Sequence, residues 1–295
     1  MKILLAGKNG QLGFELRRAL APLGDIIGVD RNACDFSDAD AVRKLVVSII
    51  PDVVVNAAAY TDVDKAEFDQ ETAFAVNAIA LGMLGEEAAR IGAMVVHYST
   101  DYVFDGAKNG VYSENDIPAP QSVYGITKLA GERVLAQTNR RHLILRTGWM
   151  YGVHGDNFLK TILRLAAERE QLSVVEDQFG TPTSASLLAD LTAHLVRQYQ
   201  REGTESFPYG TYHVAAAGET NWCAYARLVL GEALAAGRQI KTGPEQVLPL
   251  RSCEYPYAAQ RPANSRLDTT RFRDTFGLVL PHWEEGVRQV LAQLL

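Results

Sequence analysis

The sequence predicts an α/β protein built on a doubly wound parallel sheet, with a smaller lobe interleaved at its C-terminal side. Three observations lead to this fold class. Short β-branched runs alternate with longer amphipathic stretches through the first half of the chain, as in consecutive βαβ units. A glycine-rich turn joins the first apolar run to the first helical stretch. Polar residues gather where the apolar runs end, which is the edge where Rossmann-type sheets place their ligands.

The predicted strands are apolar on both faces, which is typical of buried parallel strands. They cover residues 2–7, 25–30, 52–59, 93–100 and 142–148. Helical periodicity predicts the connecting helices over residues 11–21, 38–49, 64–91 and 123–138. Right-handed crossovers bring the strand ends to one edge of the sheet. We assign residues 1–148 to this first domain.

The alternation of strands and helices loosens after Thr147, where loops rich in glycine, proline and polar residues cover 149–157 and 176–185. The remaining pattern predicts strands at 172–176 and 211–216, and helices near 156–170, 185–200, 221–237, 268–276 and 283–294. We expect residues near 185–215 to return to the first domain. Residues 149–184 and 216–295 would then form a second, smaller lobe.

Composition excludes several classes of function. The 295 residues carry a net charge of −6, whereas a general nucleic-acid surface needs a basic excess. No apolar run approaches the ~18 residues of a membrane span. The three cysteines, Cys34, Cys223 and Cys253, are far apart and contain no CxxC pair. Reduced thiols of this kind predict a cytoplasmic protein.

The glycine-rich turn reads "GKNGQLG" and places Gly7, Gly10 and Gly13 between a strand and a helix. One interpretation is mechanical, because a tight turn needs glycine. The other is chemical, because bare backbone at a helix N-terminus lets a pyrophosphate approach the N–H groups. The spacing is GxxGxxG rather than the GxGxxG of the dehydrogenase fingerprint. Both interpretations stay open at this point.

The end of the second strand favours the chemical interpretation and a dinucleotide. Asp30 lies close to the offset at which an acid meets the adenosine ribose hydroxyls. Arg31 beside it could instead receive a 2′-phosphate. Asp35 and Phe36 follow, where adenine contacts are plausible, although Asp35 also fits an Asp-rich turn. We therefore expect both NADPH and NADH to bind.

A catalytic pair is predicted where the fourth strand ends and the next helix begins. Tyr124 and Lys128 in "VYGITK" are four residues apart and share one helix face. A phenol titrates near ~10, and a neighbouring ammonium and the helix N-terminus would lower its pKa. Tyr124 could then donate a proton to a carbonyl oxygen as hydride reaches the carbon. Thr100, in "STDYVF", could polarise the same oxygen.

The remaining reactive residue types show no competing chemistry. The six histidines lack metal-ligand spacing and no nucleophile elbow is present, so neither a metal site nor a hydrolase is predicted. His97 lies within a strand pattern and is interpreted as a core histidine.

Several motifs together carry a family resemblance. The glycine loop, "NAAAYTDVDKAE", "STDYVF" and "YGITK" resemble the extended short-chain dehydrogenase/reductases, which act mainly on nucleotide sugars. Within that family, "GKNGQLG", "HYSTDYVFDG", "VYGITKLAGE", "DQFGTPT" and "RPANSRLDT" are similar to the members that reduce the C4 ketone of dTDP-4-dehydro-L-rhamnose. The similarity runs essentially from end to end and implies that activity, with a second lobe that holds the dTDP-sugar.

The resemblance also implies roles for individual residues. Tyr124 would be the proton donor, Lys128 its partner and a holder of the cofactor ribose, and Thr100 would tune the carbonyl. The pyrophosphate would lie along Gly10, Gln11 and Leu12, and the adenosine along Asp30, Asp35 and Phe36. The nicotinamide side would be flanked by Ala59, Tyr60, Thr61 and Tyr98. The sugar nucleotide would contact Thr100, Asp101, Tyr102, Trp149, Asn157 and Arg261, with the planar guanidinium suited to a diphosphate.

Two rival functions follow from the same scaffold. An epimerase or dehydratase of nucleotide sugars is one, although only a single acid, Asp101, follows Thr100. A non-catalytic regulatory subunit is the other, although Thr100, Tyr124 and Lys128 are intact.

Some close relatives are thought to dimerise around Mg²⁺ held by carboxylates, one of them at the position that is Ser186 here. Glu15 and Asp190 remain on nearby helices. A hard cation prefers charged oxygen ligands, so we predict no metal site and no metal dependence of any homodimer.

Overall fold

The computed structural model describes residues 1–295 and confirms the doubly wound fold class. Six parallel strands form one sheet in the order β10-β5-β4-β3-β1-β2. All four of its central strands are almost fully buried, as the apolar runs require. In spatial order the strands are β10 (Gly210–His213), β5 (His142–Thr147), β4 (Met94–Thr100), β3 (Val53–Asn56), β1 (Lys2–Ala6) and β2 (Asp25–Val29).

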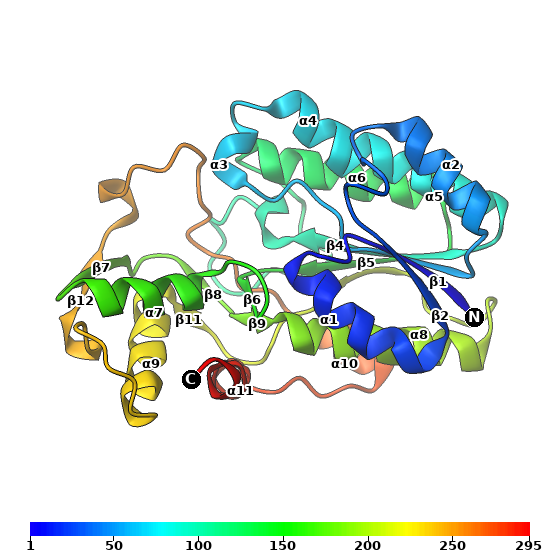
Figure 1. Cartoon of the computed structure of the whole chain (residues 1–295). Helices are drawn as coiled ribbons and strands as arrows, with labels where there is room; N and C mark the ends of the chain where they lie inside the picture. Colours follow the sequence, from blue (N-terminus) through cyan, green and yellow to red (C-terminus); the bar gives the residue numbers. More distant parts are fainter.

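Helices cover both faces of this sheet, giving three layers (Figure 1). One face packs against α1 (Gln11–Leu20), α8 (Ala185–Glu202) and α10 (Thr270–Phe276). The other packs against α2 (Ala39–Ile49), α5 (Ala80–Arg90) and α6 (Val123–Thr138). Each face therefore has its own hydrophobic core, and the strand ends between the layers are left open toward the smaller lobe.

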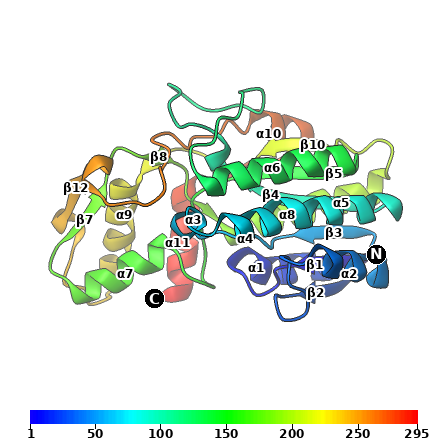
Figure 2. The ribbon, with the colours of Figure 1, turned by 90° about the horizontal axis from the view of Figure 1, so that it is seen from above.

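The smaller lobe lies beside the carboxyl edge of the sheet (Figure 2). Its own core joins three helices, α7 (Phe158–Glu168), α9 (Trp222–Ala235) and α11 (Trp283–Leu294). Short strand pairs complete it, namely β6 (Met150–Tyr151) with β9 (Thr183–Ser184), β7 (Leu172–Val175) with β12 (Val247–Leu250), and β8 (Phe179–Gly180) with β11 (Thr220–Asn221).

One late segment returns to the large sheet. Phe272 and Phe276 of α10 lie in the same core as Tyr212 of β10, although the sequence grouped residues 216–295 with the smaller lobe. We therefore propose that the larger domain includes α10.

The helix predicted over 64–91 is wrong as a single element. The structure has α3 (Val63–Ala66), α4 (Gln70–Phe74), a π-helical turn (Ala75–Ile79) and only then α5. The Asp62 carboxylate caps α3 by accepting from the Lys65 N–H, which starts a separate short helix. The π turn brings Asn77 inward, where its amide bonds both the N–H and the carbonyl of Tyr60. The break thus braces the loop that follows β3.

None of the helices is both long enough and apolar enough to cross a membrane.

Candidate active site

A cavity of about 610 Å³ opens at the carboxyl ends of β1, β3, β4 and β5. It continues into a second cavity of about 370 Å³ beside the end of β2, since Gly10 and Ala57–Ala59 line both. This is the edge where the polar residues were expected to meet. The first cavity is lined by Gly10, Gln11, Leu12, Ala59, Thr61, Tyr98, Thr100, Asp101, Tyr102, Tyr124, Lys128 and Trp149 among the predicted residues, and the second by Gly7, Gly10, Asp30, Arg31, Asp35, Phe36, Ala59 and Tyr60.

The glycines of the first turn are present for two different physical reasons. Gly7 has a φ of +78°, and a Cβ there would lie 2.8 Å from the Ala57 carbonyl. A Cβ on Gly13 would lie 2.0 Å from the Gly7 oxygen, so helix α1 can approach the turn only with glycine. Gly10 is the N-cap of α1 and provides no side-chain cap to its N–H groups. Gly7 and Gly13 are therefore needed by the turn, whereas Gly10 leaves bare backbone facing the cavity, which suits a pyrophosphate.

The end of β2 carries exposed charges. Asp30 accepts from the Asn9 amide at 2.8 Å and lies 3.4 Å from the Lys8 ammonium. Hydrogen bonding from the Ala33 N–H lowers the pKa of the Asp30 carboxyl. Arg31 is 79% exposed and pairs with Asp35 at 3.6 Å. An acid and an exposed guanidinium thus stand side by side where an adenosine ribose, with or without a 2′-phosphate, would fit.

The end of β4 and the start of α6 carry buried groups instead. Ser122 caps α6 by accepting from the Gly125 N–H, which directs the first turn of the helix toward the strand end. Lys128 is only 1% exposed, and burial lowers the pKa of its ammonium to about 8. Its Nζ lies 2.7 Å from the Tyr98 carbonyl oxygen, to which it donates, and 3.0 Å from His97 Nε2.

The expected lowering of the phenol pKa is wrong for this arrangement. Burial raises the pKa of Tyr124, and the nearby Asp101 carboxylate adds to this effect, while the Thr100 hydroxyl opposes it. Tyr124 consequently holds its proton at neutral pH, which is the form that a proton donor needs.

Unpaired polar atoms mark this end of the cavity. Thr100 Oγ1 donates to Asp101 Oδ1 at 3.0 Å and accepts from the Tyr102 N–H at 3.1 Å. The second carboxylate oxygen of Asp101 and the hydroxyls of Ser99 and Thr147 are buried without a partner. Burial raises the pKa of the Asp101 carboxyl to about 6. Buried polar atoms without partners are rare in folded proteins, and in a cavity they are ready to bind a polar ligand.

Trp149 is held in an uncommon conformation at the mouth of the smaller lobe. Its φ is +48°, a region that a bulky residue rarely adopts. Its ring stacks on Trp222 with centroids 3.6 Å apart, and a Cβ on Gly180 would lie 2.5 Å from the Trp149 ring. Sequence reasoning missed Trp222, which also lines the cavity. The one sequence feature that could have indicated Trp222 as a site residue is its position at the N-terminus of the helix predicted over 221–237.

Three predicted residues lie outside the lining of both cavities. Gly13 packs against the turn, as described above. Asn157 caps α7 by accepting from the Lys160 N–H, and its amide donates to Gln11 Oε1 at 2.8 Å. Arg261 bonds Asp64 at 2.6 Å and the Tyr102 hydroxyl at 3.3 Å. Asn157 and Arg261 thus contact residues that line the cavity, and their binding roles stay predictions.

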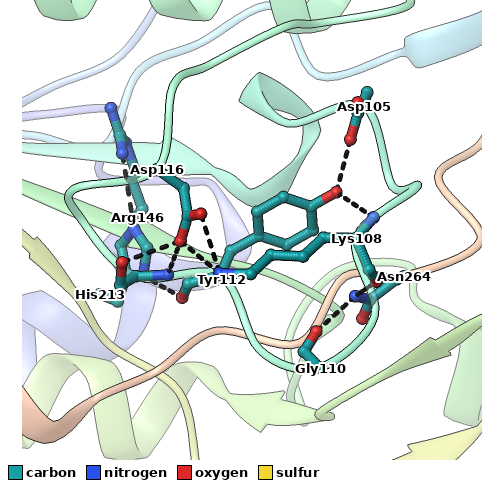
Figure 3. A network of polar contacts seen from close by, with 9 residues as sticks. Asp105, Lys108, Gly110, Tyr112, Asp116, Arg146, His213 and Asn264 are labelled. Atoms are coloured by element: carbon teal, nitrogen blue, oxygen red, sulfur yellow. Dashed lines mark hydrogen bonds and ion pairs between the residues drawn. The ribbon is translucent and has the colours of Figure 1, made fainter.

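A network of polar contacts fixes the segment that follows Asp101 and Tyr102 (Figure 3). The Tyr112 hydroxyl donates to Asp105 at 2.5 Å, and Lys108 bonds Asp116 through its Nζ. The Asn264 amide donates to the carbonyls of Lys108 and Gly110 at 2.7 and 2.6 Å. Residues near 105–116 are therefore tied to the tail that carries Arg261, and the loop beside the catalytic strand end is held from two sides.

The residues present do not fit a Mg²⁺ site. Ser186 offers a neutral hydroxyl and lies 3.1 Å from Ser184 Oγ. Glu15 and Asp190 are both bonded by Arg18, at 3.1 and 2.9 Å. A hard cation prefers free, negatively charged oxygen ligands, and no group of three or more His, Cys, Asp or Glu side chains is placed to hold a metal.

Comparisons with known proteins agree with this geometry. The family model described as "RmlD substrate binding domain" matches residues 1–295. A dTDP-4-dehydrorhamnose reductase of Escherichia coli K12 is 48% identical over 298 residues, covering 100% of this chain and 98% of that protein.

Two solved structures of similar proteins share the fold over almost their whole length. A dTDP-4-dehydrorhamnose reductase from Clostridium acetobutylicum has a TM-score of 0.91 and 36% identity, covering 100% of this chain and 99% of that one. Another from Bacillus anthracis, solved in complex with NADP, has a TM-score of 0.89 and 34% identity, covering 99% of each chain. The chain therefore belongs to the family of the RmlD substrate binding domain.

Proposed function

We propose that this chain reduces the C4 ketone of dTDP-4-dehydro-L-rhamnose to the alcohol of dTDP-L-rhamnose, using NADPH or NADH. The observation that carries the proposal is the buried group of Thr100, Tyr124 and Lys128 at one end of a cavity whose other end has bare backbone at a helix N-terminus. The family model matches this chain over residues 1–295, and the Escherichia coli relative that is 48% identical to it is named a dTDP-4-dehydrorhamnose reductase.

The chain's own residues supply the proton and the electrostatics. The bound nicotinamide supplies the hydride. Tyr124 holds its proton at neutral pH and gives it to the sugar oxygen, which becomes the C4 hydroxyl while the phenol becomes a phenolate. Thr100 donates a hydrogen bond to the same oxygen, which polarises the ketone. Lys128, four residues after Tyr124 on the same helix, stabilises the phenolate and holds a ribose hydroxyl.

The cofactor would lie along the joined cavities. Gly10, Gln11 and Leu12 hold the pyrophosphate at the start of α1, which matches the uncapped N–H groups there. The adenosine lies beside Asp30, Asp35 and Phe36, and Arg31 meets a 2′-phosphate when one is present. Ala59, Tyr60, Thr61 and Tyr98 flank the nicotinamide side.

The sugar nucleotide would occupy the part of the cavity between the sheet and the smaller lobe. Asp101 and Tyr102 contact the sugar from the sheet side, and Trp149 from the lobe side. Arg261 gives up its contact with Asp64 to fork onto the diphosphate. Asn157, the N-cap residue of α7, contacts the sugar nucleotide from the smaller lobe.

The cysteine content and the net charge support proposals about the cellular compartment and the partners of the enzyme. The three cysteines are unpaired, which suits the cytoplasm. The net charge of −6 speaks against a nucleic-acid partner, and any homodimer would form without metal.

Turnover with dTDP-4-dehydro-L-rhamnose and each nicotinamide tests the proposal. With either cofactor, we expect one molecule of NADPH or NADH to be oxidised for each molecule of alcohol formed. A dehydratase or epimerase would convert the sugar without net oxidation of the cofactor, and a regulatory subunit would bind ligands without turnover. Either of those outcomes would overturn the proposal.

A further inference from the structure

The side-chain amide of Gln11 joins the glycine-rich turn to the smaller lobe. Gln11 is the first residue of α1, so its backbone N–H is among the uncapped donors at the start of that helix. Its side chain makes two contacts with the lobe: Nε2 donates to the Met150 carbonyl at 3.2 Å, and Oε1 accepts from the Asn157 amide at 2.8 Å. Both ends of the Gln11 amide are therefore engaged by the lobe, while its backbone N–H is left to meet a pyrophosphate.

The amide of Asn157 has little capacity left for a ligand. Its nitrogen donates to Gln11 Oε1 and to the Gly152 carbonyl, both at 2.8 Å. Its oxygen accepts from the Lys160 N–H at 3.1 Å and so caps α7. One lone pair of that oxygen remains, and it is the one position that can accept from a sugar hydroxyl. Most of the Asn157 amide thus serves to link α7 to the glycine-rich turn.

The loop between β6 and α7, residues 152–157, is held to its own helix. The Lys160 ammonium donates to the Gly155 carbonyl at 2.6 Å and to the Val153 carbonyl at 3.2 Å. Together with the Asn157 cap, these bonds tie the loop to the first turn of α7. Because loop and helix are joined in this way, a contact made by the loop also orients the helix.

The same loop lies directly on the glycine-rich turn. A Cβ on Gly155 would lie 3.4 Å from Gln11 Cβ. His154 Nε2 lies 3.1 Å from the Asn9 carbonyl oxygen, and its ring stacks on Phe14 of α1 with centroids 4.4 Å apart. The bond between His154 and Asn9 is exposed, so water can replace it, whereas the two bonds of the Gln11 amide are partly buried. The Gln11 amide is therefore the stronger link between turn and lobe.

We propose that Gln11 is a positioning residue that couples binding of the cofactor to binding of the sugar nucleotide. The inference rests on the proposed function, because it concerns how these two ligands act on each other. A pyrophosphate bound at the start of α1 fixes the backbone of the turn, and the Gln11 amide then fixes the Met150 carbonyl and the N-terminus of α7. Met150 follows Trp149, which lines the cavity from the lobe side. Each ligand therefore binds more tightly when the other is present, since the lobe has already been ordered against the turn.

Calorimetric titration of the full chain measures this coupling without turnover. The probes are NADPH and the product dTDP-L-rhamnose, a pair that cannot react, each titrated alone and with the other at saturation. We expect NADPH to tighten dTDP-L-rhamnose binding at least about 5-fold, and dTDP-L-rhamnose to tighten NADPH binding by the same factor, as linkage requires. Independent binding of the two would overturn this inference and leave the reductase function standing. Failure of either ligand to bind would overturn both.

Two variants test whether the coupling passes through the Gln11 amide. Gln11→Met keeps the length of the side chain but loses both hydrogen bonds, and Asn157→Ser keeps a cap on α7 but is too short to reach Gln11. We expect the coupling factor to fall to about 2-fold or less in both, which is the scatter of independent effects. Asn221→Ser makes the same exchange at the N-cap of α9, which does not contact the turn, and should keep the wild-type factor. A wild-type factor in Gln11→Met, or an equal fall in Asn221→Ser, would overturn the assignment.

Discussion

The two ends of the cofactor groove are built from the same parts but hold their charges in opposite ways. Each end is formed where a parallel strand gives way to a loop or helix. At the β4 end Lys128 is 1% exposed, whereas at the β2 end Arg31 is 79% exposed. Burial shifts the pKa of Tyr124, Lys128 and Asp101 by large amounts, while the charges near Asp30 face solvent.

The difference lies in the dielectric around each group. Charges in a dry site interact strongly and cannot be replaced by water, whereas exposed charges are screened. A change at the buried end should therefore alter chemistry or stability by orders of magnitude, and a change at the exposed end should alter only selectivity. Five predictions test this contrast.

The largest effect is expected for Tyr124→Phe at the buried end. Loss of the proton donor should lower kcat roughly 10²–10⁴-fold while cofactor binding is kept. Steady-state kinetics and fluorescence titration with NADPH would measure both. Tyr199→Phe is the matched control. It removes a phenolic hydroxyl from the hydrophobic core on the α1, α8 and α10 face of the sheet, and it should leave kcat unchanged. A Tyr124→Phe variant with near-wild-type kcat would contradict the assignment.

The Asp101 carboxyl should make stability depend on pH. Burial raises its pKa from 3.8 to about 6, so between these values the folded chain holds a proton that the unfolded chain has lost. The stabilisation that Asp101 itself contributes should fall as the pH rises from about 4 to about 6, by on the order of 3 kcal/mol, so wild type should lose that much stability relative to Asp101→Asn over this range. Urea unfolding of wild type and Asp101→Asn across this range would measure it. The same slope in both proteins would show that Asp101 is not the group responsible.

A substitution at Gly13 tests the close packing of the glycine-rich turn, which lies between the β2 and β4 ends of the cofactor groove. Gly13→Ala places a Cβ against the Gly7 oxygen, which should destabilise the fold by about 1–3 kcal/mol and raise KM for the cofactor. Gly231→Ala in α9 is the control, because the nearest atom to its Cβ is 3.7 Å away. That variant should be neutral or more stable by about 0.5–1 kcal/mol. Equal melting temperatures for Gly13→Ala and wild type would refute the close packing.

A smaller, selective effect is expected at the exposed end. Arg31→Ala should weaken NADPH several-fold and leave NADH almost unchanged, because only NADPH carries the 2′-phosphate that Arg31 can meet. Comparing kcat/KM for the two cofactors measures this selectivity. An equal loss with both would mean that Arg31 does not face the adenosine ribose.

No effect is expected from removing metal. Ser186 supplies no charge, and Arg18 occupies both Glu15 and Asp190. Light scattering with and without EDTA should give the same mass. A dimer that dissociates only on chelation would prove the prediction wrong, and Ser186→Glu would then be the variant to compare.

Local patterns in the sequence were sufficient for the sheet and much of the site. Buried strands, the glycine turn and the i,i+4 pair of Tyr124 and Lys128 depend on near neighbours, so their spacing carried the information. The fold class followed from them, whereas the family resemblance rested on longer motifs such as "STDYVF" and "DQFGTPT", and both are confirmed. The start of α6 and the end of β4 were placed together because parallel strands end at one edge.

Only the tertiary structure decided the features that depend on partners from distant segments. The 64–91 stretch has helical periodicity, but Asn77 must reach Tyr60, and the chain breaks into short helices and a π turn to let it. The pKa of Tyr124 rises because the enclosing fold removes water from the phenol, which the YxxxK spacing does not reveal. Trp222 lines the cavity and stacks on Trp149, a contact between segments that are far apart in the sequence. Sequence periodicity reports which face of an element is buried, whereas the contacts that set charge, proton position and cavity shape arise where separate elements meet.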